Sequence, residues 1–244
     1  ADYVVDSWQT DAGLPHNAVT ALAQTKDGYL WVGTSNGLAR FDGVRFAVFR
    51  AVDNPGLKNN RVLCLCEDQQ GILWIGTEQG GLARYEQGQF TAFTTADGLA
   101  SDTVTCLGQA GELWVGTASG LNRWSEGRVG SFFRTEGLPE EMVYAVCQPH
   151  GGPLLAGTQG GLYRSHQEHW TSYLPPEATP IERAGAVYCL HEDRNGQVWA
   201  GGELGLVRFP SPSDTTNTPP AVRICSSTVL TLLEASDGGT WFGT

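Results

Sequence analysis

The sequence DGYLWVGT at residues 27–34, followed by GLARF at residues 37–41, decides the fold because it recurs along the whole chain. Two full copies follow: GILWIGT with GLARY at residues 71–77 and 81–85, and GELWVGT with GLNRW at residues 111–117 and 120–124. Three shorter copies follow these: LLAGT at 154–158, VWAGG at 198–202 and TWFGT at 240–244. The second-to-last residue of the first stretch, Gly33, has an equivalent glycine in every copy, at intervals of 40 to 44 residues. A period in the low forties, built of short strands and glycine turns, is typical of β-propeller blades.

Each repeat is predicted to form one blade of four short antiparallel strands. In the first repeat the four predicted strands cover residues 19–24, 29–34, 38–41 and 44–49. Asp27-Gly28 supplies a hairpin turn, because glycine tolerates a positive φ. Trp31 is expected to be buried between neighbouring sheets, and Gly33 is expected to let the adjacent backbone approach closely.

We therefore predict an all-β fold, a single β-propeller domain or propeller fragment over residues 1–244. Five full repeats are expected at about residues 14–56, 57–98, 99–137, 138–183 and 184–225, and a partial sixth at residues 226–244. A strand predicted over residues 2–8 has no blade before it, so we expect it to close the ring by completing the last blade. Because the sixth repeat lacks its third strand, we expect either a fragment of a longer polypeptide or a ring that closes irregularly.

Composition argues against two classes of partner. The chain has 26 acidic and 15 basic residues, and its formal net charge is −11. It contains no run of Lys and Arg, so nucleic acid is not an expected partner. No apolar stretch approaches the roughly 20 residues that span a bilayer, so no membrane span is expected within these residues.

The cysteines are predicted to be packing residues rather than a disulfide or metal framework. In the aligned repeats, Cys64, Cys106 and Cys189 share one position of the innermost strand, and Cys66 and Cys147 share another. Most other repeats have Ala or Gly at these positions, so Cys replaces a small apolar residue. Cys64 and Cys66 lie on the same face of one strand, which is a poor geometry for a disulfide. Unpaired cysteines argue mildly against an oxidising compartment unless burial protects the thiols.

With the repeats laid out, the chain resembles the two-component regulator propeller family, whose repeats occur in the sensor regions of bacterial hybrid histidine kinases. The matching stretches are DAGLPHNAV at residues 11–19, DGYLWVGT at residues 27–34 and GLARFDG at residues 37–43. The resemblance extends over essentially the whole chain and is weak in the fourth repeat, where Leu155 stands in place of Trp.

The resemblance implies a non-enzymatic sensor propeller, usually seven-bladed, in the periplasm or another extracytoplasmic compartment. It implies that the partners are signalling domains of the same parent chain and that the ligand is a small molecule, with oligosaccharides the ligands of the best-studied relatives. No kinase, membrane span or output domain occurs in these 244 residues, so the signalling role rests on the resemblance.

The candidate ligand-binding face is the end of the ring where the crossovers between blades and the turns after the second strands meet. The crossovers vary in their polar residues, as a binding surface would. The candidate residues are His16, Asn17, Asn36, Asn59, Asn60, Arg61, Asp102, Glu140, Glu141, Tyr144, Arg183 and Tyr188. The two tyrosines would stack on a sugar, and the amides and carboxylates would bind its hydroxyls. The alternative for each polar residue is a solvated or turn-capping role, and for each tyrosine a core position.

Catalytic and cofactor signals are weak. The five histidines are scattered over different predicted strands and loops. His166 and His169 are three residues apart, but no further ligand follows at the spacing of a metal site. No glycine-rich phosphate loop precedes a helix. No catalytic residue, metal or cofactor is therefore predicted.

Three alternatives remain open. The stretch DGGTWF at residues 237–242 is similar to streptogramin-type lyases, and such an enzyme would need a histidine near a carboxylate in the central channel. A protein-interaction scaffold would need an exposed apolar patch on one face. Finally, open strand edges in the last blade would allow self-association with another copy.

Overall fold

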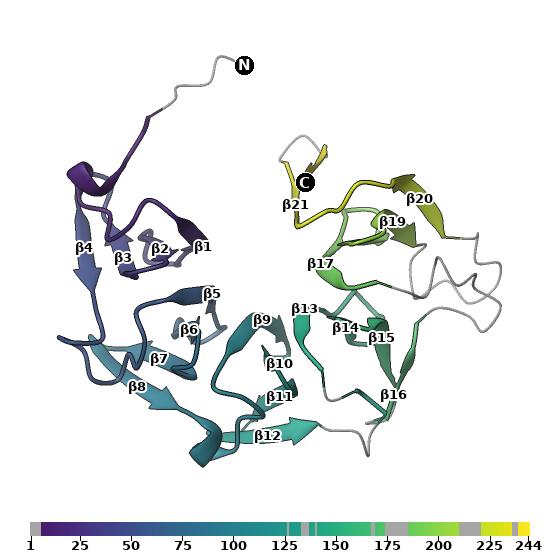
Figure 1. The fold of residues 1–244 in the computed structure, drawn as a ribbon, viewed down its shortest axis with the longest axis horizontal. Coiled ribbons are helices and arrows are strands. Elements are labelled where there is room, and N and C mark those ends of the chain that lie inside the picture. The colour runs from purple at the N-terminus through teal and green to yellow at the C-terminus, as the bar shows by residue number, and fades with distance from the viewer. Residues whose placement is uncertain are drawn as a thin grey trace. The chain divides into compact units, whose positions relative to one another are not determined.

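The computed structural model describes residues 6–125, 127–132, 137–139, 141–166, 169–173, 185–209, 221–235 and 239–244 (Figure 1). The chain forms two compact units, residues 1–107 and residues 108–244. The described secondary structure is strands and two short 3₁₀ helices. Within these ranges no helix has the length and apolar character that a membrane crossing requires.

Unit 1 contains two four-stranded antiparallel sheets, and in both the spatial order of the strands follows the sequence. The first consists of β1 (Val19–Gln24), β2 (Leu30–Thr34), β3 (Gly37–Phe41) and β4 (Phe46–Phe49). The second consists of β5 (Val62–Glu67), β6 (Leu73–Thr77), β7 (Leu82–Glu86) and β8 (Gln89–Phe93). The 3₁₀ helices η1 (Thr10–Ala12) and η2 (Thr95–Asp97) lie in the segments that lead to β1 and to the strand after β8.

The boundary between the units lies inside β9 (Val104–Ala110). β9 belongs to a sheet with β10 (Glu112–Thr117), β11 (Gly120–Ser125) and β12 (Arg128–Phe132). Two further four-stranded sheets follow: β13 (Val143–Cys147), β14 (Leu155–Thr158), β15 (Gly161–His166) and β16 (His169–Ser172), then β17 (Val187–Glu192), β18 (Val198–Gly202), β19 (Gly205–Phe209) and β20 (Val222–Cys225). A two-stranded sheet, β21 (Thr231–Glu234) and β22 (Thr240–Gly243), comes last. One antiparallel sheet per repeat confirms the predicted all-β blades and the partial sixth repeat.

The predicted closing strand lies mostly outside the described residues. Of residues 2–8, only Asp6–Trp8 are described, and they are not in a strand. Trp8 packs on Phe41 of β3, with 5.2 Å between the ring centroids. The role of this segment in closing the last blade stays a prediction.

The tryptophans of the second strands in the first two sheets lie in the core, as predicted for Trp31. Trp31 is 2% exposed and Trp74 is 1% exposed. The ring centroid of Trp31 is 5.6 Å from that of Phe49 in its own sheet and 5.0 Å from that of Tyr85 in the second sheet. Each such side chain removes a large apolar surface from water, so these residues stabilise the junction between the sheets.

Valines from one sheet pack against glycines of the sheet before it. A Cβ placed on Gly33 would lie only 2.6 Å from Val62 Cγ1, so no larger residue fits there without a shift. We call such a glycine a socket and its valine a knob. The corresponding distances in the other described sockets are 2.6 Å for Gly76 and Val104, 2.8 Å for Gly157 and Val187, and 2.7 Å for Gly201 and Val229. The close approach predicted at Gly33 is thus confirmed and repeated.

The cysteines serve packing, as predicted. Cys64, Cys66, Cys147, Cys189 and Cys225 are not in disulfides. A Cβ on Gly201 would lie 2.6 Å from Cys189 Sγ, which shows how little room this position leaves. Burial raises the pKa of the Cys66, Cys147 and Cys189 thiols to about 11. Such thiols are protonated and poorly reactive at neutral pH, so burial would protect them in an oxidising compartment.

Candidate ligand-binding face

In the first three repeats, the side chain two positions before the knob valine holds the crossover in shape. In three repeats this side chain accepts a hydrogen bond from the backbone N–H of a residue seven to nine positions earlier: Thr10 to Asn17 (2.9 Å), Ala51 to Asn60 (2.8 Å) and Thr95 to Asp102 (2.6 Å). These bonds satisfy N–H groups at the start of a tight turn or 3₁₀ helix. Asn17, Asn60 and Asp102 therefore have a turn-capping role, and their part in ligand binding stays a prediction.

The residue before this position also caps a turn. It accepts a hydrogen bond from the backbone N–H two residues later: Ala18 to His16 Nδ1 (2.9 Å), Arg61 to Asn59 Oδ1 (2.9 Å) and Thr103 to Ser101 Oγ (3.2 Å). Such local bonds are typical of Asx-type turns. His16 and Asn17 are exposed and Asn59 is half-buried, so parts of these side chains remain accessible.

Glu141 links the fourth crossover to the turn after β14. Its Oε1 accepts hydrogen bonds from Thr158 Oγ1 (2.5 Å) and from the backbone N–H of Gly160 (3.0 Å). The pKa of Tyr163 is raised, mainly by burial and also by the charge of Glu141. This places a negative charge and a tyrosine hydroxyl at the same end of this blade.

Tyr144 and Tyr188 form an aromatic pair at the starts of two neighbouring inner strands. Their ring centroids are 5.0 Å apart at an interplanar angle of 80°, and both residues are half-buried. The Tyr188 hydroxyl donates to Glu203 Oε1 (3.1 Å), whose other oxygen accepts the Ala186 N–H (3.3 Å). Desolvation first, and then the hydrogen bond to Glu203, raises the pKa of Tyr188. Neither tyrosine is fully buried, so the predicted stacking role is geometrically open to both.

The remaining candidate ligand-binding residues are either exposed or lie outside the residues that the structure describes. Asn60 Nδ2 donates weakly to Asn36 Oδ1 across 3.4 Å, which joins two candidates in unit 1. Arg61 pairs with Glu78 (3.1 Å), and both side chains are exposed, so the pair contributes little to stability. Glu140 and Arg183 lie outside the described residues.

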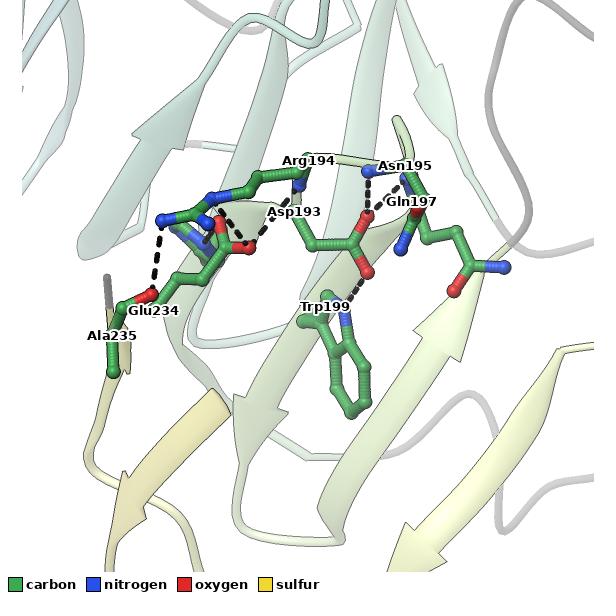
Figure 2. Close-up of polar contacts among 8 residues, drawn as sticks. Asp193, Arg194, Asn195, Gln197, Trp199, Glu234 and Ala235 are labelled. Atoms are coloured by element: carbon green, nitrogen blue, oxygen red, sulfur yellow. Dashed lines mark hydrogen bonds and ion pairs between the residues drawn. The ribbon is translucent and has the colours of Figure 1, made fainter. Parts of the chain in front are cut away.

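The opposite, hairpin end of the blades carries carboxylates that the sequence analysis did not single out. Each accepts a backbone N–H from the hairpin of the preceding blade: Lys26 to Glu67 (3.0 Å), His150 to Glu192 (2.8 Å) and Arg194 to Glu234 (3.5 Å). The last contact is the most elaborate (Figure 2). Arg194 Nε lies 3.3 Å from Glu234 Oε1, and its Nη2 donates to the Ala235 carbonyl (3.0 Å).

Glu234 also lies near His191 of β17. Among the described ion pairs, this is the one in which an inner-strand histidine approaches a carboxylate. His191 Nε2 is 3.4 Å from Glu234 Oε2, but this buried nitrogen has no hydrogen-bond partner among the described residues. The Glu234 side chain is 13% exposed. Because Glu234 already binds Arg194, these three side chains serve the packing of β17 against β21. Among the described residues, no three His, Cys, Asp or Glu residues are arranged to hold a metal ion.

The sequence analysis also did not single out Asp193, the aspartate that holds Trp199. Asp193 Oδ2 accepts the Trp199 indole N–H (2.8 Å), and its Oδ1 accepts the N–H groups of Asn195 and Gln197 (Figure 2). The sequence signal was present, since Asp precedes Trp by six residues, with Gly midway, in the second and fifth repeats. The role is structural, because it fixes the hairpin and the indole together.

Comparison with known proteins agrees with the repeat pattern. The family model described as two component regulator propeller matches residues 13–36, 56–79 and 182–203. No curated protein matches the chain.

Among solved structures, the extracellular domain of the hybrid two component system BT3049 from B. thetaiotaomicron is similar over 100% of this chain. The identity is 24% and the TM-score 0.82, and the match covers 34% of that protein, so this chain spans about a third of its length. PorZ, a surface component of the type-IX secretion system of Porphyromonas gingivalis, matches 93% of this chain and 37% of its own (16% identity, TM-score 0.69).

Virginiamycin B lyase from Staphylococcus aureus matches 92% of this chain and 77% of its own, at 12% identity and a TM-score of 0.70. At these identities the likeness shows the β-propeller fold and nothing more. The fold and the three matched segments together confirm the resemblance: at residues 13–36, 56–79 and 182–203 this chain carries repeats that match the two component regulator propeller family.

Proposed function

We propose that this chain is a ligand-binding sensor module of a two-component signalling protein, that it works in an extracytoplasmic compartment, and that it performs no chemistry itself. The support is the family of its repeats and the fold it shares with the extracellular domain of a hybrid two component system. Binding would shift the geometry of the attached signalling segments of the parent chain. A ligand can do this only by binding one arrangement more tightly than another.

The observation that carries the binding site is the half-buried pair of Tyr144 and Tyr188. The two residues come from neighbouring inner strands, so their spacing is fixed by two packed sheets rather than by a mobile loop. Glu203 is hydrogen-bonded to Tyr188, and Glu141 lies in the crossover just before Tyr144. Aromatic rings next to acceptor oxygens form the combination that binds sugar rings and their hydroxyls.

A neutral oligosaccharide is the ligand class that fits best. The described candidates at this site offer ring faces and carboxylate acceptors, and the chain as a whole has a formal net charge of −11. That charge disfavours anionic saccharides, because like charges repel at long range.

Titration calorimetry with a panel of neutral oligosaccharides tests the proposal. For a saccharide that binds, Tyr144→Ala and Tyr188→Ala should each weaken the affinity about tenfold, the usual effect of removing a central aromatic anchor. Tyr29→Ala is the matched control, since Tyr29 lies at the hairpin end against Arg40, and it should leave the affinity unchanged. If the tyrosine variants bind like the wild type, the site is misplaced. If no saccharide binds, the ligand class is wrong.

The lyase alternative would depend on His191 and Glu234. Their nearest atoms are 3.4 Å apart, beyond the roughly 2.6–3.2 Å at which a general base reaches its proton, and the contact of Glu234 with Arg194 gives the carboxylate a structural role. Cleavage of a bound ligand that is lost in His191→Ala, while the fold is kept, would favour the enzyme.

A further inference from the structure

His191 occupies a position of the inner strand that holds small side chains in the repeats before it. It lies on β17, directly opposite Trp199 of β18 in the register of the two strands. The residues at the same position of the first four repeats are Ala23, Cys66, Gly108 and Cys147. An imidazole is larger than any of these side chains, and it can become charged near neutral pH. The fifth repeat therefore carries a titratable group where the other repeats carry a packing residue.

This position faces the inner strand of the next sheet. Cys147 shows this in the fourth repeat, because burial, and then the charge of Glu192 on the next inner strand, raises the pKa of its thiol to about 11. The same relationship joins His191 of β17 to Glu234 of β21. His191 Nε2 lies 3.4 Å from Glu234 Oε2, and the two side chains are 29% and 13% exposed.

The neutral form of His191 leaves this contact incomplete. Nε2 is buried and has no hydrogen-bond partner among the described residues. An unprotonated nitrogen here would direct its lone pair toward a carboxylate oxygen, and this arrangement is not attractive. A proton on both ring nitrogens turns the same contact into an ion pair. The attraction is strengthened by the partial burial of both side chains.

Arg194 is the other charged group that meets Glu234, and it leaves one oxygen for the imidazole (Figure 2). Arg194 Nε lies 3.3 Å from Oε1 of Glu234, whereas His191 lies next to Oε2. One carboxylate can therefore serve two cations, one at each oxygen. Without a charge on His191, only the Arg194 side of the carboxylate is paired with a cation.

The other titratable groups around His191 are already engaged or neutral. Asp193 accepts the Trp199 indole N–H and two backbone N–H groups. Arg208 lies over the Trp199 ring, 5.6 Å from its centroid. Cys189 is on the same strand, and burial raises the pKa of its thiol to about 11, so it is uncharged at neutral pH.

Glu192, the next residue along β17, belongs to a different junction. Both of its carboxylate oxygens accept the backbone N–H of His150, in the hairpin of the preceding blade. Glu234 is therefore the carboxylate that the geometry assigns to a charged His191.

We propose that the junction between β17 and β21 is a pH-sensitive contact, in which acidification charges His191 and the ion pair with Glu234 tightens the packing of β21 on the fifth blade. The added stability is present while the imidazole carries its second proton, and it is lost as the pH rises. The relevant range is pH 5 to 8, in which imidazole side chains change their charge. The inference rests on the geometry of this junction and is independent of the proposed ligand site.

Hydrogen–deuterium exchange of the whole chain at pH 5.5 and pH 7.5 tests this, with protection corrected for the effect of pH on intrinsic exchange. The Val229 N–H reports on the junction, because it donates to the Gly202 carbonyl of the fifth blade (3.0 Å). Residues 229–235 should be about fivefold better protected at pH 5.5, an effect between that of an exposed ion pair and that of a buried one.

Residues 62–67 of β5 are the internal reference. There Glu67 accepts the Lys26 N–H as Glu234 accepts the Arg194 N–H, but Ala23 stands in place of the histidine. Protection of this segment should be the same at both pH values. A pH difference of equal size in residues 62–67 would overturn the proposal.

Two variants remove the ion pair with little change of shape. His191→Cys introduces the residue type of the second and fourth repeats, and Glu234→Gln removes the charge but keeps an acceptor oxygen. Both should lose the pH difference in residues 229–235. His169→Gln is the matched control, because it removes an exposed imidazole of β16, and it should keep the difference.

Circular dichroism confirms that each variant is folded. A wild type with equal protection of residues 229–235 at both pH values overturns the proposal. So does a pH difference that persists in folded His191→Cys or Glu234→Gln. These results leave the proposed ligand site untouched, because that site is tested with saccharides at Tyr144 and Tyr188.

Discussion

Trp74 donates its indole N–H to Asp68 Oδ2 across 2.8 Å, and both side chains are buried in the second sheet. The other oxygen of Asp68 accepts the backbone N–H groups of Gln70 and Ile72, each at 2.9 Å. One carboxylate therefore holds both the hairpin turn and the large side chain that fills the junction between sheets. Asp193 and Trp199 repeat the arrangement in the fifth blade.

Replacing Asp68 with alanine should lower the free energy of unfolding by about 2–4 kcal/mol, because three N–H groups lose their acceptor in a buried place. Asp68→Asn keeps an acceptor oxygen and should lose less. Urea unfolding followed by tryptophan fluorescence measures both. An equal loss in the two variants would contradict the role of the acceptor.

The socket at Gly33 predicts a steric effect. Gly33→Ala should cost about 1–3 kcal/mol, because the new Cβ meets Val62 Cγ1 at 2.6 Å in a packed junction. Gly130→Ala is the control, since a Cβ there has only an ordinary contact, 3.7 Å from the Arg123 carbonyl. If the clash is the cause, the double variant Gly33→Ala/Val62→Ala should lose less stability than the sum of the two single losses. A loss that equals or exceeds this sum would show that the clash is not the cause.

The crossover hydrogen bonds predict that Asn60 is first a structural residue. Asn60→Ala should lower the free energy of unfolding by about 1 kcal/mol, since the Ala51 N–H loses its partner. Asn36→Ala, at an exposed position with one long contact, should change stability by less than about 0.5 kcal/mol. Thermal and urea unfolding of both variants measure the difference. Equal stability of the two would contradict the capping role.

A structural feature could be predicted from the sequence where its residues recur at the same position of several repeats. Trp31 and Gly33 recur at a fixed spacing, so their burial and close packing could be predicted from the pattern alone. The variable polarity of the crossovers predicts Asn17 and Asn60 as binding residues, and this stays a prediction. Their hydrogen-bond partners, Thr10 and Ala51, lie seven and nine residues earlier, where only the path of the crossover brings them close. Such contacts cannot be read from composition.

The cysteine thiols predict a loss of stability at high pH. Burial raises the pKa of Cys66, Cys147 and Cys189 from 9.0 to about 11, so the folded protein holds these protons more tightly than the unfolded chain. The contribution is fully present below pH 9 and is lost as pH rises to about 11. The urea midpoint should fall over this range.

The triple variant Cys66→Ala/Cys147→Ala/Cys189→Ala is the control and should show a smaller fall. A disulfide-exchange reagent at neutral pH offers a second readout, because the folded thiols should react about a hundredfold more slowly than unfolded ones. An identical pH dependence in the triple variant would show that other groups cause the loss.

The most direct test of the sensor account is hydrogen–deuterium exchange of the chain with and without a bound neutral oligosaccharide. The account predicts slower exchange at the crossover end, in residues 141–147 and 186–190, where Tyr144 and Tyr188 lie. It predicts no change at the hairpins of the same blades, residues 148–152 and 193–197. Protection confined to the hairpin end would contradict the placement of the ligand on the crossover face.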